Sequence, residues 1–151
     1  MKYTVEAETT VNAPASRIYA LLADYHHGHP RVLPSAFTGL QVIEGGTGVG
    51  TVIDVGMKAF GSVRTVRGYV TEPEPGRVLE EAYPASDIVT RFYIAQVSER
   101  ATRVRIWSQL SSKGGVPGWL ERKLMTSFLR KVYRQELQLI EAVASERTPT
   151  G

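Results

Sequence analysis

All three histidines of this chain lie within four positions, shortly after an aspartate. The stretch DYHHGHPRVLP runs from Asp24 to Pro34 and contains His26, His27 and His29. Imidazole is a common zinc ligand and a frequent general base, so this segment could bind a metal or move protons. The spacing argues against a metal, because the histidines match neither i,i+4 helical geometry nor strand alternation. We therefore expect no metal and no other cofactor, and a solvated turn is the alternative reading.

Strands and helices predicted around this segment must position it. Apolar residues alternate over 3–11, which predicts a half-buried strand, and NAPASRIYALLADY then changes to helical spacing. HHGHPRVLP follows as a loop or a very short helix. Six more strands are predicted at 37–46, 51–59, 62–71, 78–83, 87–97 and 102–111, before a long amphipathic helix from Trp119 to about Ser145. Strands that are segregated from helices favour an α+β fold with an antiparallel sheet.

Length and composition indicate one domain. The chain has 151 residues, of which 42% are hydrophobic and 22% charged, and it has no cysteine. We expect a single domain over 1–146 and a frayed tail over 147–151. Without cysteine there can be no disulfide, thiolate ligand or cysteine nucleophile. No membrane span or signal peptide is apparent, so a cytoplasmic location is expected.

The charge pattern gives little support to nucleic-acid binding. A formal net charge of +3 is small, and no aromatic platform accompanies the basic residues. Charged residues of the long helix are predicted to share its outer side: Arg122, Lys123, Arg130, Lys131 and Arg134, interleaved with Glu121 and Glu136. A solvated face is the ordinary interpretation, and weak contact with an anionic membrane surface or a protein partner is the alternative. The chain is expected to be a monomer or a homodimer.

Strand parity predicts which side chains face the interior. If residues 60–61 form the turn of an even-length hairpin, Asp54 lies opposite Arg67, and this ion pair belongs on the wet side. The other face of that hairpin then points inward: Thr51, Ile53, Val55, Met57, Arg64, Val66 and Val70. In the last two strands the inward set is Ile88, Thr90, Phe92, Ile94, Val104, Ile106, Ser108 and Leu110. One of Glu80 and Glu81 must also face inward.

The predicted architecture leaves space between the sheet and the long helix. One helix rarely fills the concave face of a sheet of about seven strands, so a cavity is expected there. Its predicted wall is apolar and aromatic with sparse polar groups, which suits a hydrophobic or aromatic small molecule; a filled core is the alternative. A connected void of less than about 200 Å³ would count against this ligand hypothesis.

Several segments occur in an order typical of one group of proteins. They are TTVNAPASRIYALLADY, RVLP, EGGTGVGT, GYVTEPEPGRVLEEAY, ERATRVRIWSQLSSKGG and the long helix. With them the chain resembles the START-like, or SRPBCC, superfamily, the helix-grip group of Bet v 1 allergens and polyketide cyclase/dehydrase-like proteins. The resemblance implies a seven-stranded antiparallel sheet wrapped around a long C-terminal helix, with two short helices between strands 1 and 2. It also implies a pocket for a lipid, polyketide, steroid or other hydrophobic ligand.

Parity and resemblance together give a set of expected ligand-binding residues. They are Tyr25, His29, Leu33, Ile53, Val55, Met57, Arg64, Val66, Tyr83, Phe92, Ile94, Ser108, Leu124 and Phe128. By analogy with the family, His29 is expected at the pocket mouth. The leading hypothesis is a carrier, sensor or accessory protein that binds a hydrophobic small molecule. An aromatase/cyclase-type enzyme using Arg64, Tyr83 or His29 is one alternative, although no acid/base pair is apparent in the sequence, and a partner-binding module is another.

Overall fold

Seven strands form a single antiparallel sheet in the order β1-β7-β6-β5-β4-β3-β2. The computed structural model describes residues 1–112 and 114–146, so the predicted tail at 147–151 lies outside the described residues. The strands are β1 (Lys2–Val11), β2 (Phe37–Glu44), β3 (Val52–Ala59), β4 (Ser62–Glu74), β5 (Val78–Tyr83), β6 (Ile88–Ser98) and β7 (Ala101–Ser111). The helices are α1 (Ala15–Ala23), η1 (His29–Val32), η2 (Pro84–Ser86) and α2 (Gly115–Ala144). The predicted α+β helix-grip class is confirmed.

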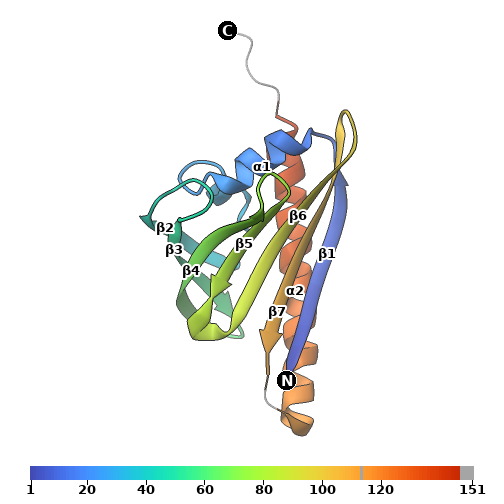
Figure 1. Cartoon of the computed structure of the whole chain (residues 1–151). Helices are drawn as coiled ribbons and strands as arrows, with labels where there is room; N and C mark the ends of the chain where they lie inside the picture. Colours follow the sequence, from blue (N-terminus) through green and yellow to red (C-terminus); the bar gives the residue numbers. More distant parts are fainter. Residues whose placement is uncertain (113, 147–151) are drawn as a thin grey trace.

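The sheet curves around α2, and the α1–η1 segment closes one end (Figure 1). Helix α2 runs beside β1 and β7, and its first turns project beyond the lower end of the sheet in this view. It begins four residues earlier than predicted, because Pro117 falls in the first turn, where a missing N–H costs nothing.

The predicted hairpin register is confirmed. Asp54 lies opposite Arg67 on the outer face, and Arg67 Nε lies 2.8 Å from Asp54 Oδ1. Phe60 and Gly61 have φ angles of 50° and 79°, as in the two-residue turns that match the twist of a hairpin. The parity that the sequence left open is also settled. Glu81 faces the interior, whereas Glu80 faces outward and accepts a hydrogen bond of 2.7 Å from Arg91.

Gly68 in β4 makes room for an aromatic ring on the concave face. A Cβ atom at this position would lie 2.6 Å from Cε1 of Tyr83, which is closer than van der Waals contact allows. The Tyr83 ring therefore packs over β4 at Gly68, where the absence of a side chain leaves room for it. In this position its hydroxyl group reaches Glu81. Gly39 in β2 is a natural comparison, because a Cβ there would meet nothing within 4 Å.

Replacing Gly68 by Ala should destabilise the protein by about 1–3 kcal/mol, because the added methyl group displaces the Tyr83 ring from a packed position. The change should lower Tm by roughly 2–4 °C for each kcal/mol, measured by thermal unfolding followed by circular dichroism. Gly39→Ala is the matched control and should leave Tm within about one degree or raise it slightly. Equal Tm values for the two variants would contradict the packing argument.

Candidate functional site

A cavity of about 100 Å³ lies between the concave face of the sheet and α2. Its wall is mostly apolar and comprises His29, Leu33, Phe37, Leu40, Ile53, Val55, Met57, Val66, Glu81, Tyr83, Ile88, Thr90, Phe92, Leu110, Leu129, Tyr133 and Glu136. This volume is half of the minimum that we expected from the sequence. The large side chains of Leu129 and Tyr133 on α2 and of Phe37 on β2 occupy much of the space that the curved sheet leaves. At this volume the cavity accommodates a small group rather than a whole polyketide.

Eight of the residues expected to bind a ligand lie in the cavity wall. They are His29, Leu33, Ile53, Val55, Met57, Val66, Tyr83 and Phe92. Three others, Tyr25, Ile94 and Ser108, are buried behind the wall. The structure thus gathers these side chains around one space, and ligand contact itself stays a prediction.

Three expected residues lie away from the cavity. Arg64 has the inward parity and pairs with Met57, but its side chain is exposed, three residues after the hairpin turn. Leu124, in the first third of α2, is 50% exposed. Phe128 is half-buried, and its ring centroid lies 5.5 Å from that of Phe60. Arg64 is therefore removed from the candidate catalytic groups.

The wall also contains residues that we did not expect as ligand contacts: Phe37, Leu40, Glu81, Ile88, Thr90, Leu110, Leu129, Tyr133 and Glu136. Strand parity had already placed Ile88, Thr90 and Leu110 inward. The prediction that Glu136 lies on the outer face of the long helix is wrong, because only 2% of it is exposed. The buried residues of α2 are Gly118, Leu129, Val132, Tyr133, Glu136, Leu137, Ile140 and Ala144. Glu136 fits the spacing of these residues, and only its charge argued against a place among them.

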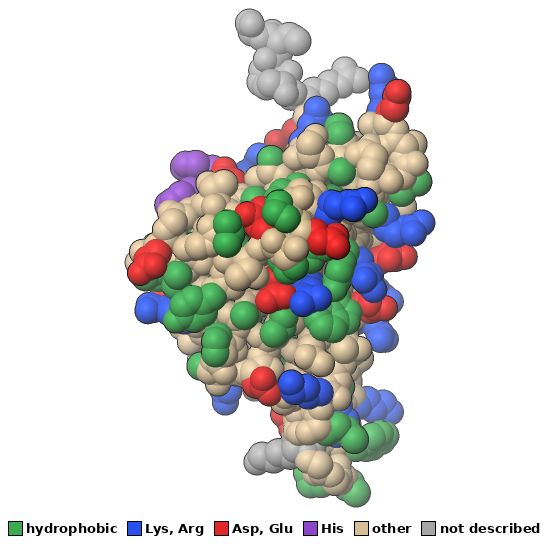
Figure 2. All heavy atoms as spheres, viewed as in Figure 1, with side chains coloured by type: hydrophobic (Ala, Val, Ile, Leu, Met, Phe, Trp, Pro, Cys, Tyr) green, Lys and Arg blue, Asp and Glu red, His purple; other side chains and the backbone are tan. Residues whose placement is uncertain are grey.

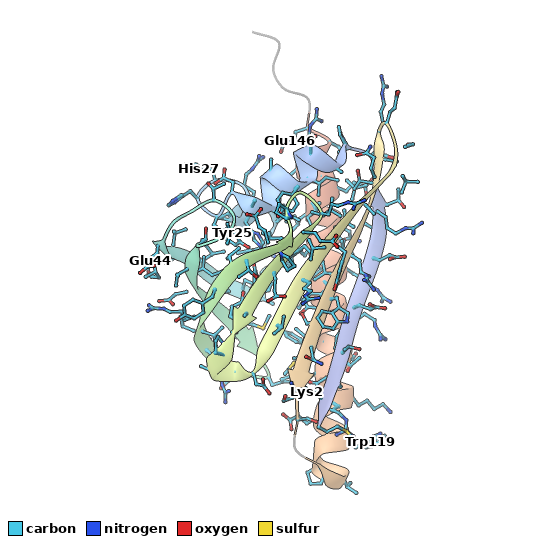
Figure 3. All side chains as sticks on the ribbon, viewed as in Figure 1. Lys2, Tyr25, His27, Glu44, Trp119 and Glu146 are labelled. Carbon is cyan, nitrogen blue, oxygen red and sulfur yellow. The ribbon has the colours of Figure 1, made fainter. Side chains whose placement is uncertain are left out.

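The three histidines do not form one site. His26 and His27 are exposed on the surface (Figures 2 and 3), whereas His29 is 2% exposed at the start of η1. The His29 ring stacks on Tyr25 at 4.7 Å and meets the edge of Phe92 at 5.4 Å. Among residues 1–112 and 114–146, no group of three or more His, Cys, Asp or Glu is arranged to hold a metal ion.

A hydrogen bond to the backbone fixes the orientation of His29. Its Nδ1 lies 2.8 Å from the carbonyl oxygen of Leu22, and a carbonyl can only accept, so Nδ1 carries the hydrogen. The other ring nitrogen, Nε2, then points toward two buried carboxyl groups. It lies 3.7 Å from Oε2 of Glu81 and 3.8 Å from Oε1 of Glu136.

The Glu81 carboxylate is held by two tyrosines. The Tyr25 hydroxyl donates to Oε2 at 2.7 Å, and the Tyr83 hydroxyl donates to Oε1 at 2.8 Å. Burial, and next the nearby Glu81 charge, raise the pKa of both tyrosines well above 10. Both hydroxyls therefore stay protonated and keep donating, which compensates the carboxylate for its lost water.

Glu136 has no such support. Its carboxyl group lies at the cavity wall and forms no hydrogen bond with any residue that the structure describes. Burial, followed by repulsion from Glu81, raises the pKa of Glu136 well above 4.5. A neutral carboxylic acid therefore faces the cavity up to a higher pH than an exposed glutamate would allow. Such an acid can donate a proton to a ligand.

Three further hydroxyl groups, from the sheet and from α2, form a chain of hydrogen bonds. Oγ1 of Thr90 lies 2.7 Å from Oγ of Ser108, which in turn lies 2.5 Å from the Tyr133 hydroxyl. Burial raises the pKa of Tyr133 to about 12, so this hydroxyl is neutral at physiological pH. The site therefore combines one apolar chamber with a cluster of groups that donate and accept hydrogen bonds.

The basic residues of α2 lie outside the cavity, mostly on the exposed side of the helix. Together with Trp119 and Tyr3 they border an open groove beside β1, and Lys123 Nζ lies 5.3 Å from the Trp119 ring centre. Trp119 marks the projecting end of α2 (Figure 3). None of the described helices is long and apolar enough to cross a membrane. Contact of this face with an anionic membrane surface or a protein stays a prediction.

Replacing Glu136 by Gln should weaken the dependence of stability on pH. The folded-state pKa of Glu136 is raised, so its effect is absent below about pH 4.5 and stability falls as pH rises toward the folded-state pKa. This loss amounts to about 1.4 kcal/mol for each unit of the shift. Thermal unfolding of wild type and variant between pH 5 and 8 should show a steeper decline for the wild type. Parallel curves for the two proteins would contradict the burial of an acid at this position.

Comparison with known proteins agrees with this architecture. The sequence profile of the family described as polyketide cyclase/dehydrase and lipid transport matches residues 2–145. No curated protein sequence matches the chain. The NMR structure of the KanY protein aligns with a TM-score of 0.85 and 24% identity, covering 97% of this chain and 99% of that one.

Two further solved structures have the same fold. An aromatase/cyclase from Streptomyces aligns with a TM-score of 0.78 and 15% identity, over 100% of this chain and 99% of that one. A START superfamily protein from Mycobacterium smegmatis aligns with a TM-score of 0.73 and 17% identity, over 93% and 96% of the two chains. These identities support the fold, and the profile match covers nearly the whole sequence. The chain therefore belongs to the polyketide cyclase/dehydrase and lipid transport family.

Proposed function

We propose that this protein binds a hydrophobic or aromatic small molecule between its sheet and α2, as a carrier, sensor or accessory protein. The observation that carries the proposal is the composition of the cavity wall, which is apolar except at one end. There His29, Glu81, Tyr83 and Glu136 come together. Such a wall suits a ligand with an apolar body and one polar group. The description of the family, which includes lipid transport, supports the same conclusion.

A ligand larger than a single ring requires the cavity to expand. The closed cavity holds about 100 Å³, whereas drug-sized ligands occupy pockets of roughly 300–1,000 Å³. The contact between Phe60 and Phe128 joins the β3–β4 hairpin to α2. Both rings are partly in solvent, so separating them exposes little new apolar surface. Opening at this contact would let a longer ligand extend from the polar end toward solvent.

Native mass spectrometry of the protein purified from its own cells should detect a co-purifying hydrophobic mass at close to one molecule per chain. Val66→Phe should remove or strongly reduce this mass, because the larger side chain fills the cavity from β4. Val63→Phe is the matched control, since Val63 lies on the same strand and is 58% exposed. Retention of the ligand in both variants would place binding elsewhere, and its absence from the wild type would count against the proposal.

An acid/base enzyme is the second candidate function. The neutral Glu136 acid, the buried Glu81 carboxylate and Nε2 of His29 converge on one end of the cavity. No acid/base pair of this kind was apparent from the amino-acid sequence. A carbonyl oxygen placed there could accept the Glu136 proton while a neighbouring base removes a proton from the adjacent carbon.

This second function predicts catalysed hydrogen exchange at the carbon beside a carbonyl. Acetophenone incubated in D₂O with the wild type should incorporate deuterium into its methyl group at least tenfold faster than in buffer, as followed by NMR. Glu136→Gln should abolish the acceleration, whereas the exposed Glu80→Gln should keep it. Exchange at the buffer rate with the wild type would leave the carrier or sensor as the better-supported function.

A further inference from the structure

We infer that the polar end of the cavity selects ligands that carry a basic nitrogen, binding a hydrophobic amine in preference to an alcohol or a carboxylic acid of the same shape. This inference rests on the proposed function, because it specifies the ligand class of the same cavity. It follows from the charges in the wall and from one buried carboxyl group that lacks a hydrogen-bond partner.

The charged residues that line the cavity are predominantly acidic. Two glutamates, Glu81 and Glu136, belong to the wall, and no Lys or Arg is among the described residues that line it. The other group that can carry a positive charge is His29, and its Nε2 already faces both carboxyl groups. An acidic ligand would bring a further negative charge into this enclosure without a cation to pair with it. Like charges in a dry site repel far more strongly than in water.

Glu136 is buried and, among the described residues, has no hydrogen-bond donor beside it. Its carboxyl group is 98% removed from solvent and points into the cavity, and it forms no hydrogen bond with a described residue. A buried polar group without a partner costs free energy, which a ligand recovers by supplying the missing contact. An ammonium group supplies both a hydrogen-bond donor and a compensating charge. A charge-assisted hydrogen bond of this kind is roughly twice as strong as a neutral one.

The groups around Glu136 leave its carboxyl group available for a hydrogen bond with the ligand. Glu81 on β5 is already occupied by two tyrosine hydroxyls, and Tyr133 on α2 is engaged with Ser108. His29 on η1 approaches to 3.8 Å, which is too far for a hydrogen bond. The ligand nitrogen therefore meets Glu136 directly, with the Glu81 charge adding to the attraction.

Binding of an ammonium ion should also release a proton. Burial and the nearby Glu81 charge raise the pKa of Glu136 and favour its protonated form in the free protein, whereas an ammonium ion beside it favours the carboxylate, so a proton passes to the solvent. The bound pair is then an ammonium and a carboxylate, with overall charge conserved. An alcohol of the same shape leaves Glu136 protonated and releases nothing.

Isothermal titration calorimetry with three probes of equal shape tests the inference at neutral pH. Benzylamine, benzyl alcohol and benzoate share one ring, which suits the closed cavity, and differ in the polar group. We expect benzylamine to bind at least tenfold more tightly than benzyl alcohol, and benzoate most weakly. Repeating the titrations in phosphate and in Tris, whose ionisation enthalpies differ, should show release of about one proton for benzylamine and none for benzyl alcohol.

Two variants separate the carboxyl group from the rest of the site. Glu136→Gln should lower the affinity for benzylamine to that for benzyl alcohol and eliminate the proton release. A far-UV circular dichroism spectrum like that of the wild type would show that the variant is folded. Glu80→Gln is the matched control, because Glu80 faces outward and pairs with Arg91. This variant should retain the wild-type preference for the amine.

Each other outcome has a definite meaning. Equal or tighter binding of benzyl alcohol or benzoate to the wild type would overturn the inference and leave the proposed ligand cavity standing. Failure of all three probes to bind would overturn the inference and the proposed function together. Stoichiometric zinc in native mass spectra, lost in Glu136→Gln, would assign the carboxyl group to a metal and also overturn the inference.

Discussion

The buried carboxylate of Glu81 is the constraint on which the polar end of the molecule depends. A charge can remain in an apolar core only when its hydrogen-bonding capacity is satisfied. Here two tyrosines satisfy it, one from β5 and one from the segment after α1. Tyr25 therefore holds that segment against the sheet, and His29 stacks on its ring. The short helix η1 owes its place above the cavity to this arrangement.

The same carboxylate affects the chemistry of its surroundings. It helps to keep the protons on Tyr25 and Tyr83, and it raises the pKa of Glu136 further than burial alone would. Glu81 thus favours the protonated form of three groups around it: Tyr25, Tyr83 and Glu136. Glycine at position 68 is part of the same arrangement, since it gives the Tyr83 ring its space. The polar cluster and the local backbone depend on each other.

Much of the fold could be predicted from the sequence, because apolar residues recur at every second position in the strands and at every third or fourth position in the helices. The alternation of the strands and the turn at 60–61 set the register, which the Asp54–Arg67 pair confirms. Parity tells which face a side chain occupies, but not whether another layer covers that position. Arg64 and Leu124 illustrate this: Arg64 has the inward parity and Leu124 belongs to the predicted apolar stripe of α2, yet both are exposed.

The candidate site was less predictable than the fold. Glu136 occupies a core position of α2, and an amphipathic pattern assigns charged residues to the solvent side. Only the presence of space beside it and of Glu81 opposite makes burial tolerable, and both depend on tertiary structure. The size of the cavity is similarly hidden, because it is the small difference between the curvature of the sheet and the volumes of side chains such as Leu129 and Tyr133.

The pairing of β1 with β7 has a consequence for how the chain reaches its folded state. Lys2 lies opposite Ser111, and the amino terminus donates a hydrogen bond to the carbonyl oxygen of Ser112. The first strand can therefore pair only after the last strand has been synthesised. A ribosome must therefore deliver most of the chain before this edge of the sheet can be completed. Closing so long a loop is entropically costly and slows folding. In the interval, β1 and the edge of β7 are unpaired β-strands that chaperones can recognise.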